Sequence, residues 1–279
     1  MIEMIFLFSL ALIWIVFAVV QDLRKREVAN WLNFSLIVFA LGFRFFYSLF
    51  SLNGFGFFYQ GLLGLLIFLL LGNLLYYSKV FAGGDAKLMI ALGTVLPFSQ
   101  SFLTNLKFFS VFFILFLFVG AAYSLAGSMV LSLRNFQKFK KEFSNQIKKN
   151  KKFIIPVLLS AIVLMALGFL EILFLFIGVL VFILPYLYVY AKAVDESCMI
   201  KKVKTSELTE GDWLYKNVRV GRNIIKASWD GLRKEDISQL KKKHKFVLIR
   251  MGIPFSPAFL ISFLILVYLW KTNLWGFLF

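Results

Sequence analysis

Long apolar runs, separated by short charged stretches, dominate this chain from one end to the other. Each run is continuous rather than alternating, which is typical of membrane-spanning helices and not of transmembrane strands. A spanning helix needs about 20 mainly apolar residues. The runs that meet this requirement are Met4–Val20, Trp31–Phe50, Phe57–Tyr77, Phe108–Leu133 and Pro254–Trp270.

Two other apolar runs have unusual lengths. Phe153–Ala191 is about twice as long as one crossing requires, so it predicts two helices with a turn near Gly168–Glu171. Ala86–Phe98 is short, and predicts either a short helix ending near Pro97 or a re-entrant segment. If it crosses, every basic stretch lies on one side of the membrane, as the positive-inside rule requires. We therefore favour a crossing, with the N-terminus outside.

Together these runs predict an all-α polytopic membrane protein of about eight transmembrane helices, with a small mixed α/β cytoplasmic subdomain. In that subdomain, turns at Glu210-Gly211-Asp212 and Val220-Gly221-Arg222 predict short strands, and Leu232–Lys243 predicts a short helix. The predicted divisions are residues 1–133 (N-terminal membrane domain), 134–152 (basic cytoplasmic loop), 153–191 (two further transmembrane helices), 192–250 (subdomain) and 251–279 (C-terminal transmembrane helix).

Composition agrees with a membrane protein, because 61% of the residues are hydrophobic and only 16% are charged. The net charge of +17 could suggest nucleic acid binding. The basic residues instead gather in Arg134–Lys152 and Lys192–Arg250, where attraction to anionic membrane lipids explains them. With a single cysteine, Cys198, and a single histidine, His244, the chain predicts no multi-cysteine zinc site and no histidine metal site.

Two aspartates carry the best clue to the chemistry. Asp22 follows the first apolar run, and Asp85 precedes the short one, so both are expected at the cytoplasmic face. Ionisable groups at membrane depth are costly, which makes them functional candidates. Taken singly, Asp22 could be an interfacial residue and Asp85 a helix cap. Two carboxylates in one pocket would suit acid/base hydrolysis of the aspartic protease kind.

At these residues the chain resembles the type IV prepilin peptidase and preflagellin peptidase family of intramembrane aspartyl proteases. The similar stretches are Gln21–Val28 and Gly83–Leu88, and Ala82 replaces the first glycine of the family's Gly-x-Gly-Asp box. Leu208–Leu214 and Gly252–Pro257 are similar to the tail of archaeal members. The resemblance implies catalytic roles for two residues and supporting roles for four others: Asp22 and Asp85, and Gln21, Gly83, Gly84 and Lys87.

The resemblance further implies an endopeptidase that removes a short basic leader, the class III signal peptide, from type IV pilin-like or archaellin precursors. The cut is expected at the cytoplasmic membrane surface, and it uses water alone. Three acidic residues are candidates to receive the lysines of the leader: Glu27, Glu210 and Asp212.

Two other interpretations remain open. A presenilin-like intramembrane protease would place both aspartates in the middle of spans, whereas Asp22 borders a basic stretch. A proton-coupled transporter or a membrane scaffold could also use Asp22 and Asp85, but no internal repeat is visible. A scaffold would tolerate an exchange of either aspartate for asparagine, and a protease would not.

Overall fold

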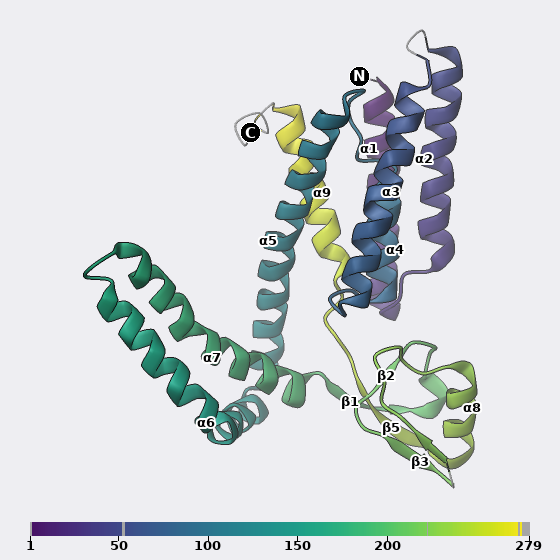
Figure 1. Cartoon of the computed structure of the whole chain (residues 1–279). Coiled ribbons are helices and arrows are strands. Elements are labelled where there is room, and N and C mark those ends of the chain that lie inside the picture. Colours follow the sequence, from purple (N-terminus) through teal and green to yellow (C-terminus); the bar gives the residue numbers. More distant parts are fainter. Residues whose placement is uncertain (1, 52–53, 222, 273, 275–279) are drawn as a thin grey trace. The chain divides into compact units, whose positions relative to one another are not determined.

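The computed structural model describes residues 2–51, 54–221, 223–272 and 274, and Figure 1 labels its elements. The helices are α1 (Ile2–Lys25), α2 (Asn30–Phe50), α3 (Gly56–Tyr77), α4 (Gly83–Leu92), α5 (Phe102–Arg134), α6 (Phe136–Leu167), α7 (Ile172–Cys198), α8 (Lys234–Lys243) and α9 (Ser256–Lys271). The strands are β1 (Ile200–Lys204), β2 (Trp213–Leu214), β3 (Val218–Val220), β4 (Asn223–Ile225) and β5 (Phe246–Arg250).

The predicted fold class is confirmed: the chain is a helical multi-pass membrane protein with a small strand-containing region. Within the described residues, six helices are long and apolar enough to cross a membrane, namely α1, α2, α3, α5, α6 and α7. The apolar helix α9 is shorter than these. The total of about eight crossings stays a prediction.

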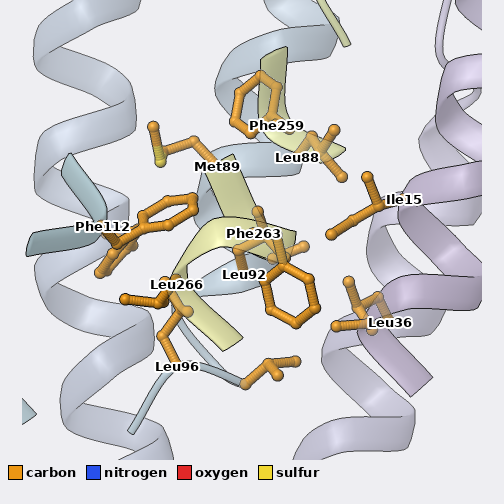
Figure 2. Packing of buried hydrophobic residues seen from close by; sticks show 14 of the residues in the cluster. Ile15, Leu36, Leu88, Met89, Leu92, Leu96, Phe112, Phe259, Phe263 and Leu266 are labelled. Carbon is orange, nitrogen blue, oxygen red and sulfur yellow. The ribbon is translucent and has the colours of Figure 1, made fainter. Parts of the chain in front are cut away.

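The chain divides into two compact units, and the first contains α1 to α4, most of α5, and α9 (residues 1–125 and 254–279). Its core is one apolar cluster to which all of these helices contribute. Leu88, Met89 and Leu92 of α4 lie at the centre of this cluster (Figure 2). Because α4 is surrounded by other helices, its position is fixed by packing on several sides.

The short apolar run predicted from the sequence forms α4 and an irregular continuation, residues 93–101. This segment runs antiparallel to α3 along most of the length of that helix. Gly72 of α3 lies against Ile90, and Gly64 lies against Gly93 and Pro97. Near the start of α3, Gln60 Nε2 donates a hydrogen bond of 3.1 Å to the carbonyl of Gln100. The arrangement supports a crossing that is helical in its first half only.

Arg44 of α2 satisfies the backbone of the irregular half. Its Nε donates to the Thr94 carbonyl at 2.8 Å, and its Nη2 donates to the carbonyls of Val95 and Pro97 at 3.0 and 2.7 Å. Nη1 donates to the Phe57 carbonyl at 3.0 Å, and the whole side chain is buried. Non-helical backbone at membrane depth is tolerated only when its polar groups find partners in the protein. Arg44 supplies these partners.

The second unit, residues 126–253, begins with a helical hairpin of α6 and α7. Residues 136–152, predicted as part of a basic loop, are instead the first half of α6. They are helical because an apolar face packs on α7, with the rings of Phe139 and Tyr190 5.6 Å apart. The chain turns between the two helices at residues 168–171, the predicted position.

The rest of the second unit is a small subdomain in which α8 packs on a three-stranded sheet. The strand order is β1-β5-β2 and the pairing is antiparallel, while β3 and β4 form a separate hairpin. The predicted turns are present at Gly211 and Gly221, whose φ angles of 95° and 64° favour glycine. Arg222, the last residue of the second predicted turn, lies outside the described residues.

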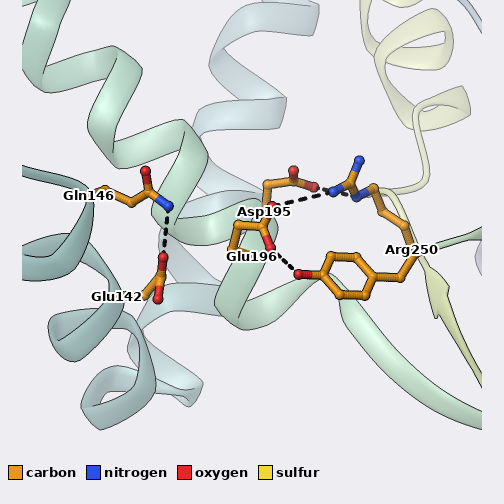
Figure 3. A network of polar contacts seen from close by, with 6 residues as sticks. Glu142, Gln146, Asp195, Glu196 and Arg250 are labelled. Atoms are coloured by element: carbon orange, nitrogen blue, oxygen red, sulfur yellow. Dashed lines mark hydrogen bonds and ion pairs between the residues drawn. The ribbon is translucent and has the colours of Figure 1, made fainter. Parts of the chain in front are cut away.

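A polar network joins this sheet to the last turn of α7 (Figure 3). Arg250 of β5 forms ion pairs of 3.0 Å with Asp195 and 3.6 Å with Glu196. The hydroxyl of Tyr215 donates a hydrogen bond of 2.6 Å to Glu196. The orientation of the sheet on the end of α7 is therefore fixed by side-chain contacts as well as by the short connection.

Candidate functional site

Asp22 lies in the last turn of α1, and its side chain is buried. Its Oδ2 accepts a hydrogen bond of 2.9 Å from the backbone N–H of Ser256, the first residue of α9. The N–H groups in the first turn of a helix have no partner within that helix, and α9 has no side-chain cap of its own. Asp22 thus caps α9, and α9 in turn holds the Asp22 carboxylate in place.

Asp85 lies in the first turn of α4 and is half-buried. Val28, which follows α1, lies beside Gly84, the residue before Asp85, and the two aspartates are near enough to interact electrostatically. Acidic side chains are favourable at a helix N-terminus, which explains why the first turn of α4 accommodates Asp85.

The connection between α1 and α2 packs against the start of α4. Gln21 Oε1 accepts a hydrogen bond of 2.9 Å from the Ala29 backbone N–H, which fixes the path of the connection. Lys87 Nζ donates to Asn30 Oδ1 at 2.6 Å and so joins α4 to the start of α2. Gln21 thus holds the connection and Lys87 joins α4 to the start of α2. The supporting roles implied by the resemblance stay a prediction.

The two glycines before Asp85 are not forced by packing. A Cβ at Gly83 would lie 3.8 Å from Tyr76, and one at Gly84 would lie 3.5 Å from the Cβ of Val28, which are ordinary contact distances. The glycines that exclude a side chain are elsewhere, in particular Gly64 and Gly72 of α3. A side chain would therefore fit at either position, and the supporting roles of Gly83 and Gly84 stay a prediction.

The start of α9 is also joined to the segment that leads into α4. The ring of Phe255 contacts those of Phe81 and Phe116, at centroid distances of 6.1 and 5.5 Å. A Cβ at Gly120 of α5 would lie only 2.7 Å from the Phe255 ring, so this glycine makes room for it. One short segment, Phe255–Ser256, thereby contacts the surroundings of both aspartates.

Several residues near the aspartates were not predicted. Tyr123 of α5 is half-buried and interacts electrostatically with Asp22. The Ser256 hydroxyl and the side-chain amide of Asn33 on α2 are buried without a hydrogen-bond partner among the described residues. A serine directly before Pro257 is a helix-start signal, which could have drawn attention to Ser256. No local pattern distinguishes Tyr123 or Asn33 from other residues in apolar helices.

The three candidate leader contacts lie in different surroundings. Glu27 is exposed directly after α1, in the first unit. Glu210 and Asp212 belong to the second unit, where Glu210 forms an exposed ion pair of 3.8 Å with Lys234. Asp212 Oδ2 accepts a hydrogen bond of 2.8 Å from the Thr209 backbone N–H. Asp212 thus has a structural role in its turn, and Glu27 is the candidate in the same unit as the two aspartates.

Chemically, the site offers two carboxylates, one buried and one half-buried. Such a pair can activate a water molecule and polarise a carbonyl group. Among the described residues, no cluster of three or more His, Cys, Asp or Glu side chains could hold a metal ion.

Comparison with known proteins agrees with these motifs. Residues 9–125, which include Asp22 and Asp85, match the type IV leader peptidase family. The predicted resemblance is confirmed. A preflagellin peptidase of Methanococcus maripaludis is 29% identical to the chain over 128 residues. That match covers 43% of this chain and 55% of the relative. The chain therefore spans about half the length of this curated protein. No solved structure matches the chain.

Proposed function

We propose that this protein is a membrane-embedded aspartic endopeptidase with Asp22 and Asp85 as its catalytic residues. It cleaves the short basic leader from type IV pilin-like or archaellin precursors at the cytoplasmic face of the cell membrane. The observation that carries the proposal is the convergence of Asp22 and Asp85 within the segment that matches the leader peptidase family. The name of the Methanococcus relative supports the class of substrate.

In this mechanism, the two aspartates share one proton: the ionised carboxylate takes a proton from water, while the other, as a neutral carboxyl group, donates a hydrogen bond to the scissile carbonyl. The hydrogen bond from the Ser256 backbone holds Asp22. Gln21 and Lys87 hold the connection that packs on α4, which carries Asp85. Gly83 and Gly84 carry no side chain that would keep an extended substrate backbone away from Asp85. The step consumes only water, and no cofactor takes part.

The decisive experiment measures cleavage of a pilin-like precursor and an archaellin precursor by the protein reconstituted in membranes. Exchange of Asp22 or Asp85 for asparagine should each lower the rate by about 100- to 10,000-fold, which is the usual contribution of a general acid–base group. The product mass identifies the bond that is cut. Asp230→Asn is the matched control, since this exposed residue belongs to the subdomain, and it should cleave at the wild-type rate.

Cleavage that survives Asp22→Asn or Asp85→Asn would contradict the catalytic pair. Absence of cleavage with both precursors, in a folded wild-type protein, would favour a transporter or scaffold. Cleavage of a transmembrane helix within its apolar part, rather than at the leader junction, would indicate the presenilin-like alternative.

Glu27 is the acidic residue that we propose contacts the basic leader near the cut. Glu27→Lys should raise the KM for a basic-leader precursor about tenfold and leave kcat nearly unchanged, because it acts on binding rather than on the reacting groups. Glu210→Lys tests whether the subdomain shares this role. If Glu27→Lys raises the KM for a precursor with a neutral leader by the same factor, the proposal that Glu27 recognises the charge of the leader is wrong.

A further inference from the structure

The sheet of the subdomain has one face covered by the core and one face that is open. Val247 and Ile249 of β5 point into the core beneath α8. Phe246 and Leu248 point the other way and are 39% and 44% exposed, so two large apolar side chains lie on the same open side of one strand. We call the open side the outer face, defined by these residues and their neighbours: Lys202, Lys204, Phe246, Leu248 and Arg250.

Lysines surround the apolar centre of the outer face. The register places Lys202 opposite Leu248 and Lys204 opposite Phe246, and directly opposite residues share a face. Lys202 Nζ lies 4.9 Å from the centroid of the Phe246 ring. The face therefore combines two exposed apolar side chains with cationic side chains from the adjacent strand.

Two hollows extend this basic surface. One of about 360 Å³ is lined by Lys202, Lys216, Phe246 and Leu248 among others. The other, of about 430 Å³, is lined by five lysines: Lys204, Lys241, Lys242, Lys243 and Lys245. Within the described part of the chain, no acidic residue lines either hollow. Glu207, which forms a 3.8 Å pair with Lys204, is the nearby acid that partly balances this charge.

The outer face also contacts the end of a membrane helix. Arg250 belongs to this face, and it pairs with Asp195 and Glu196 in the last turn of α7 (Figure 3). Tyr215, next to β2, donates its hydroxyl to Glu196 as well. Since α7 is long and apolar enough to cross the membrane, its last turn lies close to the bilayer surface. The same face of the sheet is thereby directed toward that surface.

We propose that the outer face is a docking surface for the anionic headgroups of the bilayer that α7 crosses. Phe246 and Leu248 enter the boundary between headgroups and acyl chains, and the surrounding lysines contact the headgroups. Solvation alone would account for the lysines but leaves the two apolar side chains in water at a cost. This inference does not depend on the peptidase activity.

The test measures whether residue 248 contacts lipid in the full-length protein. Leu248→Cys is made in a Cys198→Ala background, labelled with an environment-sensitive fluorophore, and reconstituted in nanodiscs that contain brominated lipids. With anionic lipids, the probe should be quenched several-fold more strongly than a probe at Ser238→Cys, which is exposed on α8. Phe246→Cys provides a second site if the label at 248 alters thermal unfolding.

Charge dependence separates lipid docking from simple proximity. The Lys202→Gln/Lys204→Gln pair should shift the equilibrium away from the docked state about fivefold for each lysine, and high salt should do the same. Lys226→Gln/Lys234→Gln is the matched control, because these exposed lysines lie outside the outer face, and it should have no effect.

Equal quenching at 248 and 238, or equal quenching in anionic and zwitterionic nanodiscs, would overturn the proposal. Protection of residue 248 that requires an added precursor protein would also overturn it, since the face would then bind protein. Each of these results is independent of whether the protein cleaves any precursor.

Discussion

Residues 83–100 run through the first unit as a ten-residue helix with an irregular continuation, whereas α6 and α7 are uninterrupted helices of 32 and 27 residues. In their most apolar windows only 11% of the α6 residues and 17% of the α7 residues are buried, against 44% for α1. Apart from the turns before Pro156 and Pro185, which each lack one backbone donor, these helices satisfy their backbones internally and can face lipid on most sides. The irregular segment depends on protein around it.

This difference shows which parts of the membrane domain can hold the polar side chains that a reaction needs. A short, enclosed helix allows a polar residue such as Asp85 to sit at its first turn, inside a packed environment that other helices define. A lipid-facing helix offers no such enclosure, because a charge exposed to lipid is costly. The comparison predicts that the first unit is sensitive to single substitutions and that the lipid-facing side of the hairpin is tolerant.

The largest expected effect comes from removal of the Arg44 side chain. Arg44→Met should destabilise the first unit by about 4 kcal/mol, because it leaves four carbonyl groups without their buried donor. Arg44→Lys should recover only part of this stability, since an ammonium group cannot reproduce the fork of donors. The measurement is the free energy of unfolding of the reconstituted protein by steric trapping.

A stable Arg44→Met variant would show that the irregular segment has other partners, and the enclosed crossing would then need a different explanation. Cleavage activity gives a second readout. If Arg44 also keeps α4 in place, Arg44→Lys should lower kcat by a larger factor than it raises KM, because the substitution changes no contact with the substrate.

The approach of α3 to the irregular segment depends on Gly64, whose position excludes a Cβ because of the Gly93 carbonyl and Pro97. Gly64→Ala should cost about 2 kcal/mol, as expected when extra volume is forced into a well-packed contact. Gly42→Ala on α2 is the matched control, since nothing lies within 4 Å of its added Cβ. It should be neutral or stabilising by up to about 1 kcal/mol. Equal effects of the two changes would contradict the close packing of α3 on the crossing.

Much of the fold could be predicted from the lengths of apolar runs. Two helices were predicted for Phe153–Ala191 because a single helix of that length would exceed the bilayer thickness. The short run beginning at Ala86 was recognisable as unusual for the same reason. The helical start of α6 was missed, because the lysines of 138–152 concealed the apolar positions of Phe139, which packs on Tyr190 of α7, and Phe143, which packs on Phe139.

The candidate site could be predicted only in part. Asp22 and Asp85 stand out because they are charged residues at the ends of apolar runs. The contact of Asp22 with Ser256 joins residues 234 positions apart, and no local pattern encodes such a pairing. Arg44 could have been noticed as a cation within the run Trp31–Phe50, but its partners are backbone carbonyls, which every residue carries.

The smallest expected effect is on the lipid-facing side of the hairpin. Leu159 of α6 is 59% exposed, and Leu159→Ala should change the free energy of unfolding by less than about 0.5 kcal/mol. Lipid tails are as apolar as the side chain that is removed, so exposure to them carries no hydrophobic penalty. Two residues along, Ala161 is completely buried, and its carbonyl lies close to Gly178 of α7.

Ala161→Leu should therefore separate α6 from α7 and cost about 2 kcal/mol, although it adds apolar volume to an apolar helix. The pair of variants distinguishes packing from hydrophobicity as the source of hairpin stability. If Leu159→Ala were the more harmful change, the exposed side of α6 would be occupied by another protein surface. The contrast between an enclosed crossing and a lipid-facing hairpin would then fail at this point.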